Sequence, residues 1–158
     1  MMTMCPSCFE LYSEIWSKPC CGCGYKTVSV CIELIGVAKL LINRGFKVAY
    51  ANGSTYDDKL GIGKITQFTI ELGASYPEAI FQNLPPDWTV YEFNAIKDNQ
   101  ILKPNLTGLS CVCEHSPSEC DFDSIAFAKE VTINNLELWL SWIDELASRA
   151  ILMLYNSD

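Results

Sequence analysis

The 158-residue sequence contains a single histidine and no apolar run long enough to cross a membrane. Near the C-terminus the apolar run 150–155 has six residues, whereas a membrane-spanning helix needs about 20. The N-terminal segment also lacks the basic end and apolar stretch of a secretory signal. We therefore expect a protein without a membrane span that resides in a reducing compartment, the cytoplasm.

Positive charge is scarce as well. Eleven Lys and Arg residues stand against nineteen Asp and Glu residues, which gives a net charge of −8. This balance disfavours proteins whose affinity rests on neutralising many phosphates or anionic lipids. Nucleic acid is therefore the less favoured partner. His115, the single histidine, is the only anchor for histidine-based catalysis, and we expect it in a solvated position at a strand end.

Cysteine, in contrast, is abundant, with nine residues. Two pairs, Cys5 with Cys8 and Cys20 with Cys23, each enclose two residues, and eleven residues separate the pairs. In a reducing compartment such spacing favours a metal site over disulfides. Zn²⁺ takes four thiolates tetrahedrally and keeps no open position, so these four cysteines predict a structural zinc site with Cys21 as a bystander. A redox C-x2-C pair or unligated thiols are the alternative.

Residues 3–26 with this paired spacing resemble a zinc ribbon, the four-cysteine module common in transcription and translation factors and in bacterial and phage proteins. Gly24 follows the last cysteine and suits a turn with positive φ, whereas Phe9 occupies the equivalent position of the first turn. We expect a short hairpin arm at residues 10–16, between the two pairs.

Zinc ribbons in those factors often contact nucleic acid, so the resemblance implies a set of candidate contacts around the site. These are Trp16, Lys18, Tyr25 and Lys26. Residues 1–47 contain five basic and three acidic side chains, hence +2, and Zn²⁺ with four thiolates contributes −2. Because the sum is zero, the sequence shows no basic face.

A second group of metal-ligand types lies further along the chain, at Cys113, His115 and Cys120. Residues two apart in a strand lie about 6.6 Å apart, so these side chains meet one ion only if the chain turns after the strand, at Ser116 and Pro117. The alternative is that these cysteines are ordinary buried or surface thiols.

The remaining sequence predicts alternating helices and strands. A helix begins at Thr27 or Ser29 and ends at Gly45. The expected strands are 46–51, 65–72, 88–96, 101–106 and 109–114, with a mobile loop at 52–63 and short helices at 77–84 and 123–131. A long final helix begins at Thr132 and either continues or breaks near Ser148.

This order favours an α+β fold, with an N-terminal zinc ribbon at 1–26 and, at 27–158, a two-layer α/β sandwich on a mainly antiparallel sheet. Residues 40–48 are similar to a set of small uncharacterised proteins from bacteria and their phages, in which a Cys-Ser-Gly-His turn follows the strand. This chain has Ala51-Asn52-Gly53-Ser54 there, without the thiol and the imidazole.

The C-terminal segment carries more large apolar side chains than one buried face requires. Examples are Trp139, Trp142, Leu152, Met153 and Tyr155. Either most of them pack in the core, or the surplus forms an interface with another protein or with a second copy of the chain.

Three functional hypotheses follow from these observations. The first is a zinc-binding, non-enzymatic protein that acts through protein–protein contact, an adaptor or inhibitor of the kind that phages and mobile elements encode. The second is nucleic-acid binding through the ribbon. The third is an enzyme of unrecognised class that uses the loop 52–64 with Asp57, Asp58 or His115, which we rank last because the sequence shows no nucleophile and base at a recognisable spacing.

Overall fold

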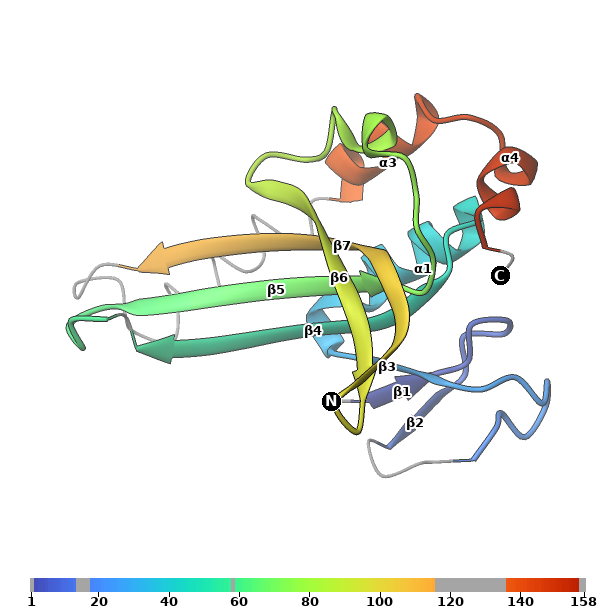
Figure 1. The fold of residues 1–158 in the computed structure, drawn as a ribbon, viewed down its shortest axis with the longest axis horizontal. Coiled ribbons are helices and arrows are strands. Elements are labelled where there is room, and N and C mark those ends of the chain that lie inside the picture. Colours follow the sequence, from blue (N-terminus) through green and yellow to red (C-terminus); the bar gives the residue numbers. More distant parts are fainter. Residues whose placement is uncertain (1, 14–17, 58, 116–135, 157–158) are drawn as a thin grey trace.

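A computed structural model describes residues 2–13, 18–57, 59–115 and 136–156. Within them, seven strands form one sheet in the order β2-β1-β3-β4-β5-β7-β6 (Figure 1). The strands are β1 Met2–Met4, β2 Leu11–Ser13, β3 Val28–Val30, β4 Val48–Asp57, β5 Lys64–Leu72, β6 Trp88–Lys97 and β7 Gln100–His115. Neighbouring strands are antiparallel except β3 and β4, which confirms the α+β class with a mainly antiparallel sheet.

Short strands at the N-terminus extend the sheet beyond β4. In Figure 1 they lie below the long strands β4, β5 and β7. β3 pairs in parallel with β4 at only two positions, Ser29 with Tyr50 and Val30 with Ala51. β4 therefore runs on past its contact with β3, from Asn52 to its end. The domain boundary at residue 26 stays a prediction, although β1 and β2 belong to the same sheet as the rest.

The helical elements are η1 Ile32–Leu34, α1 Ile35–Arg44, η2 Glu78–Phe81, α3 Leu136–Asp144 and α4 Arg149–Leu154. α1 ends as predicted at Gly45, whose φ is 111° and whose N–H bonds to the carbonyl of Ile42. The predicted helix start at residues 27–29 is wrong, because residues 28–30 join the sheet as β3. η1 and α1 then supply the crossover that two parallel strands require.

The core lies between one face of the sheet and α1, which passes behind the sheet in Figure 1. Along β5 every second side chain is buried, including Phe68, Ile70 and Leu72, while the side chains between them are half-buried. α1 contributes Val37 and Leu41 to the same core. Burying one such side chain stabilises the fold by about 1.5–3 kcal/mol. The alternation along β5 fits the predicted two-layer arrangement.

An aromatic cluster packs α3 against the rest of the core. Phe46 stacks on Trp142, and Trp142 stacks on Phe81, with 5.8 Å between ring centroids in both pairs. The indole N–H of Trp142 donates to the carbonyl of Ile80 at 3.0 Å, and Trp139 is fully buried. For these two tryptophans the core-packing alternative is confirmed.

The C-terminal segment is two helices rather than one. α3 ends at Asp144, and Ser148 caps α4 by accepting a hydrogen bond from the N–H of Ile151. The guanidinium of Arg44 in α1 donates to the carbonyl of Leu146 at 2.9 Å, which satisfies the backbone where the chain leaves the helix. A single continuous helix is therefore wrong and the break near Ser148 is confirmed, while residues 132–135 lie outside the described residues.

Two predicted interruptions of strands are also wrong. Residues 52–57, expected in a mobile loop, continue β4 and pair with β5, and β7 joins the predicted strands 101–106 and 109–114. Each place has a glycine because an aromatic ring on the neighbouring strand fills the space of its Cβ. A Cβ on Gly53 would lie 2.3 Å from the ring of Phe68, and one on Gly108 would lie 2.4 Å from that of Tyr91.

The predicted helix at 77–84 is present only as the short turn η2, and the predicted helical piece at 123–131 lies outside the described residues. No helix of the described residues is both long and apolar enough to span a bilayer.

Candidate metal centre

The first cysteine pair sits on a tight turn directly after β1. The N–H of Cys5 donates to the carbonyl of Glu10, and the N–H of Phe9 donates to the carbonyl of Cys5, both at 2.9 Å. Phe9 has a φ of 62°, a left-handed conformation that is costly for a residue with a side chain. Its ring packs against the core, and Lys39 Nζ lies 5.6 Å from the ring centre. These contacts offset the cost of the left-handed conformation at a position where glycine fits best.

The second pair repeats this geometry. The N–H of Cys20 donates to the carbonyl of Tyr25 at 2.9 Å, and the N–H of Gly24 donates to the carbonyl of Cys20 at 2.8 Å. Gly24 has a φ of 72°, as its position after the last cysteine predicts. The two turns therefore have the same backbone bonding, and each aims two sulfurs at a common point.

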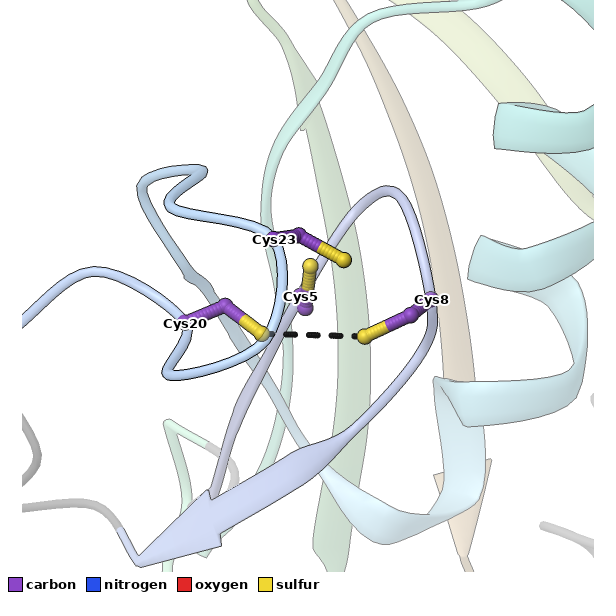
Figure 2. Close-up of side chains that lie close together, drawn as sticks. All are labelled: Cys5, Cys8, Cys20 and Cys23. Atoms are coloured by element: carbon purple, nitrogen blue, oxygen red, sulfur yellow. Dashed lines mark hydrogen bonds between the residues drawn. The ribbon is translucent and has the colours of Figure 1, made fainter.

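Figure 2 shows the four sulfur atoms pointing toward one another. Each lies within 4.8 Å of the others, and the Sγ atoms of Cys8 and Cys20 are 3.6 Å apart. A tetrahedral Zn²⁺ with Zn–S bonds of about 2.3 Å requires sulfur–sulfur distances of about 3.8 Å, so a small contraction would complete the site. A disulfide needs about 2.05 Å, and these cysteines are free. The cluster is compatible with a zinc-binding module.

The two turns shield their sulfurs unequally. Cys5 and Cys20 are buried, whereas Cys8 is exposed to solvent. The N–H of Ser7 donates to the sulfur of Cys5 at 3.4 Å, a backbone contact within the first turn. The first cysteine of each pair is thus fixed in the protein, and the second closes the site from the solvent side.

A further polar group at the site, the hydroxyl of Tyr12, was not predicted from the sequence. It donates to the sulfur of Cys20 at 3.2 Å and accepts a hydrogen bond from the N–H of Cys21 at 3.1 Å. Tyr12 lies in the middle of β2, the observed part of the expected arm at 10–16. The only signal in the sequence is a tyrosine placed between the two C-x2-C pairs.

Hydrogen bonding distributes charge unevenly among the thiols. The hydroxyl of Tyr12, followed by the N–H groups of Cys23 and Gly22, lowers the pKa of Cys20 to about 6. A backbone hydrogen bond at Glu10 favours the Cys8 thiolate, but the thiols of Cys23, Cys5 and Cys20, together with partial desolvation by the cluster, raise the pKa of Cys8 to about 12. In the absence of a cation, Cys20 therefore loses its proton at a lower pH than Cys8.

The same hydrogen bond acts in the opposite direction on its donor. By donating to Cys20, the hydroxyl of Tyr12 holds its own proton more tightly, and its pKa rises to about 12. Tyr12 is therefore a neutral donor over the whole physiological pH range.

The predicted second metal set stays a prediction. Cys113 is half-buried on β7, and Cys120 lies outside the described residues. The solvated position expected for His115 is wrong: it is 6% exposed, and its Nε2 lies 3.0 Å from Oγ1 of Thr66. β7 continues as far as His115 and pairs it with Lys64 of β5, which buries the ring. Among the described residues, the group at Cys5, Cys8, Cys20 and Cys23 is the one cluster of three or more potential ligands within reach of a single ion.

The candidate nucleic-acid contacts lie near the cysteine cluster. Lys18, Tyr25 and Lys26 are exposed, with Tyr25 at 58%, and Trp16 lies outside the described residues. Of the residues named for the enzymatic hypothesis, Asp57 forms an ion pair with Lys64 at the end of the β4–β5 hairpin, and Asp58 lies outside the described residues.

Comparison of the chain with protein families, curated proteins and solved structures gives no match. The likeness to a zinc ribbon thus rests on the spacing of the four cysteines and on the geometry of their cluster.

Proposed function

We propose that this protein binds one Zn²⁺ through Cys5, Cys8, Cys20 and Cys23, and that the ion has a structural role. The observation that carries the proposal is the convergence of four sulfurs, each within 4.8 Å of the others, from two turns of the same backbone geometry. Four thiolates complete the coordination of Zn²⁺ and leave no position for a substrate. A reducing compartment such as the cytoplasm suits this site, because only reduced thiols bind the ion.

The ion would replace a core that the N-terminal strands lack. β1, β2 and β3 have three residues each, and their fully buried apolar side chains are Met4 and Val30. Strands this short gain little from burial or pairing, and structural zinc commonly supplies the missing folding free energy in small modules.

Native mass spectrometry of the untagged protein, purified under reducing conditions with zinc in the medium, tests the proposal. We expect one zinc ion per chain, and none in the Cys5→Ser/Cys23→Ser variant. Cys21→Ser is the matched control, since Cys21 is exposed beside the cluster, and it should retain the ion. A metal-free wild-type protein would overturn the proposal, and a chain that carries iron would overturn the choice of metal, because four-sulfur sites also suit iron.

We further propose that the protein acts without catalysis, as an adaptor or inhibitor that contacts another protein or a second copy of itself. The supporting observation is the set of large apolar side chains that stay exposed on α3, on α4 and at the residue after α4, within the described residues. They are Leu136, Leu138, Leu140, Ile151, Met153, Leu154 and Tyr155. Large apolar side chains exposed on two consecutive helices are candidates for burial at a protein interface.

Light scattering during size-exclusion chromatography tests the interface. We expect the wild-type protein to run as a dimer, or as a defined complex with a purified partner, and Leu138→Glu/Leu154→Glu to run as a monomer with zinc still bound. The two leucines are 40% and 72% exposed, so neither change disturbs the core. If the wild type is a monomer and binds no partner, the interface proposal fails.

Nucleic-acid binding is the alternative, and the exposure of Tyr25 and Lys26 beside Cys23 favours it. An exposed aromatic ring next to a lysine can stack on a base while the ammonium contacts phosphate. Its signature would be salt-dependent affinity for single-stranded DNA or RNA that Lys18→Glu/Lys26→Glu abolishes. Absence of binding at low salt would remove this alternative.

A further inference from the structure

We propose that Tyr12 is a positioning residue of the metal centre, whose hydroxyl holds the sulfur of Cys20 in place and donates a hydrogen bond to it when the ion is bound. The inference rests on the proposed metal binding and adds to the four ligands a residue that does not touch the ion. No spacing rule for metal ligands points to it.

The backbone of Tyr12 is fixed relative to the first cysteine turn. Tyr12 is the central residue of β2 and pairs with Thr3 of β1, and β1 leads directly into Cys5. The ring extends from this strand to the second turn, where the hydroxyl lies 3.2 Å from the sulfur of Cys20. One side chain thus connects the two halves of the site.

The direction of the hydrogen bond is defined by a second contact. The N–H of Cys21 donates to the hydroxyl oxygen of Tyr12 at 3.1 Å, which leaves the proton of the hydroxyl for the sulfur of Cys20. A donor to a thiolate ligand draws electron density from the sulfur and restricts its rotation. Removing outer partners of this kind typically weakens metal binding by about 10- to 100-fold.

The test compares Tyr12→Phe with Tyr25→Phe in the full chain. Phenylalanine at position 12 keeps the ring and removes the donor. Tyr25 is the matched control, because the second turn uses its backbone carbonyl while its side chain is 58% exposed. We expect Tyr12→Phe to bind Zn²⁺ about 10-fold more weakly or worse in competition with a chelator, and Tyr25→Phe to match the wild type.

A spectroscopic measurement separates positioning from packing. With Co²⁺ in place of zinc, loss of a hydrogen bond to sulfur should move the thiolate-to-cobalt charge-transfer band of Tyr12→Phe to lower energy. An isosteric change, 3-fluorotyrosine incorporated at position 12 only, makes the hydroxyl a stronger donor and should move the band to higher energy. This second variant keeps the test decisive if Tyr12→Phe folds poorly.

The outcomes distinguish the two proposals. Equal affinities and unshifted bands in all variants would overturn the role of Tyr12 and leave metal binding intact. Weaker binding with an unshifted band in both position-12 variants would assign Tyr12 to packing alone and would also overturn it. A wild-type protein that takes up neither Zn²⁺ nor Co²⁺ would overturn the metal site itself.

Discussion

The N-terminal strands and the β4–β7 strands belong to one sheet but differ in what stabilises them. The first region has strands of three residues and brings together four sulfurs. The second has strands of nine to sixteen residues whose inward side chains fill an apolar core. Hydrogen-bonded continuity therefore does not imply a shared source of stability: coordination would stabilise one part, and burial stabilises the other.

Loss of a zinc ligand should destabilise the first region and leave the second intact, and this is the largest expected effect. In Cys5→Ser the site loses a buried ligand, so we expect residues 2–30 to lose protection from hydrogen exchange while β5 and β7 keep theirs. Structural zinc contributes on the order of 10 kcal/mol in small modules, which exceeds what three short strands can supply. Exchange measured by mass spectrometry on peptides from both regions checks the prediction.

The control for this experiment is Cys21→Ser, which should exchange like the wild type. Equal protection of residues 2–30 with and without Cys5 would show that both regions share one core, and the contrast between them would disappear.

Damage to the apolar core should do the reverse. Phe68 is fully buried at the centre of β5, and Phe68→Ala should lower the free energy of unfolding by about 3–5 kcal/mol. Chemical denaturation followed by tryptophan fluorescence measures this loss, while the zinc content of the native protein stays at one per chain. Leu102→Ala is the control: this side chain on β7 is 61% exposed, and the expected change is within about 0.5 kcal/mol.

Acidification should act on the first region before the second. The pKa of Cys20 falls from an ordinary 9.0 to about 6 in the folded protein, so its thiolate contributes stability above pH 9 that is lost as the pH falls through about 6. The raised pKa of Cys8 means that its proton must leave for the ion to bind. Both effects weaken metal binding at low pH.

We therefore expect the difference in melting temperature between zinc-loaded and zinc-free protein to shrink between pH 8 and pH 5.5. Zinc binding at pH 7.5, followed with a pH indicator in weak buffer, should release fewer than four protons per ion. The reason is that Cys20, one of the four ligands, is already deprotonated at this pH. A pH-independent melting difference would contradict this prediction.

The smallest expected effect concerns the two glycines of the second turn. Gly24 has a φ of 72°, so Gly24→Ala should destabilise the turn by about 1–2 kcal/mol. Gly22 has open space around its Cβ position, which makes Gly22→Ala a control that should leave zinc affinity unchanged. Chelator competition measures both, and equal affinities of the two variants would show that the turn geometry does not limit binding.

The cysteine cluster was predictable because metal coordination imposes a local rule. Two residues between ligands and a glycine after the second pair are properties of a short segment, and they can be recognised without knowing the rest of the fold. The positive φ of Phe9 after the first pair had no such signal in the sequence. Tyr12 was not predictable in the same way. Its role depends on the pairing of β2 with β1, which brings its ring to a turn eight residues further on.

The fold class followed from the pattern, but the lengths of the strands did not. Asn52-Gly53-Ser54 has the composition of a loop, yet Gly53 lies in a strand because the ring of Phe68 occupies the space beside it. Gly108 in β7 has the same relation to Tyr91. A glycine that interrupts an apolar pattern can mark a turn or the close approach of an aromatic ring, and only the neighbouring strand decides between them. The burial of His115 depends in the same way on β5.

The two-residue contact between β3 and β4 has a consequence for the protein without its ion. If the N-terminal strands detach, Tyr50 and Ala51 lose their strand partners, and the edge of β4 that runs on past β3 becomes longer by these residues. Such an exposed strand edge can pair with an extended peptide, including β4 of another molecule. Loss of zinc would then appear first as aggregation of molecules whose main core is still folded, and the bound ion would protect the protein against this aggregation.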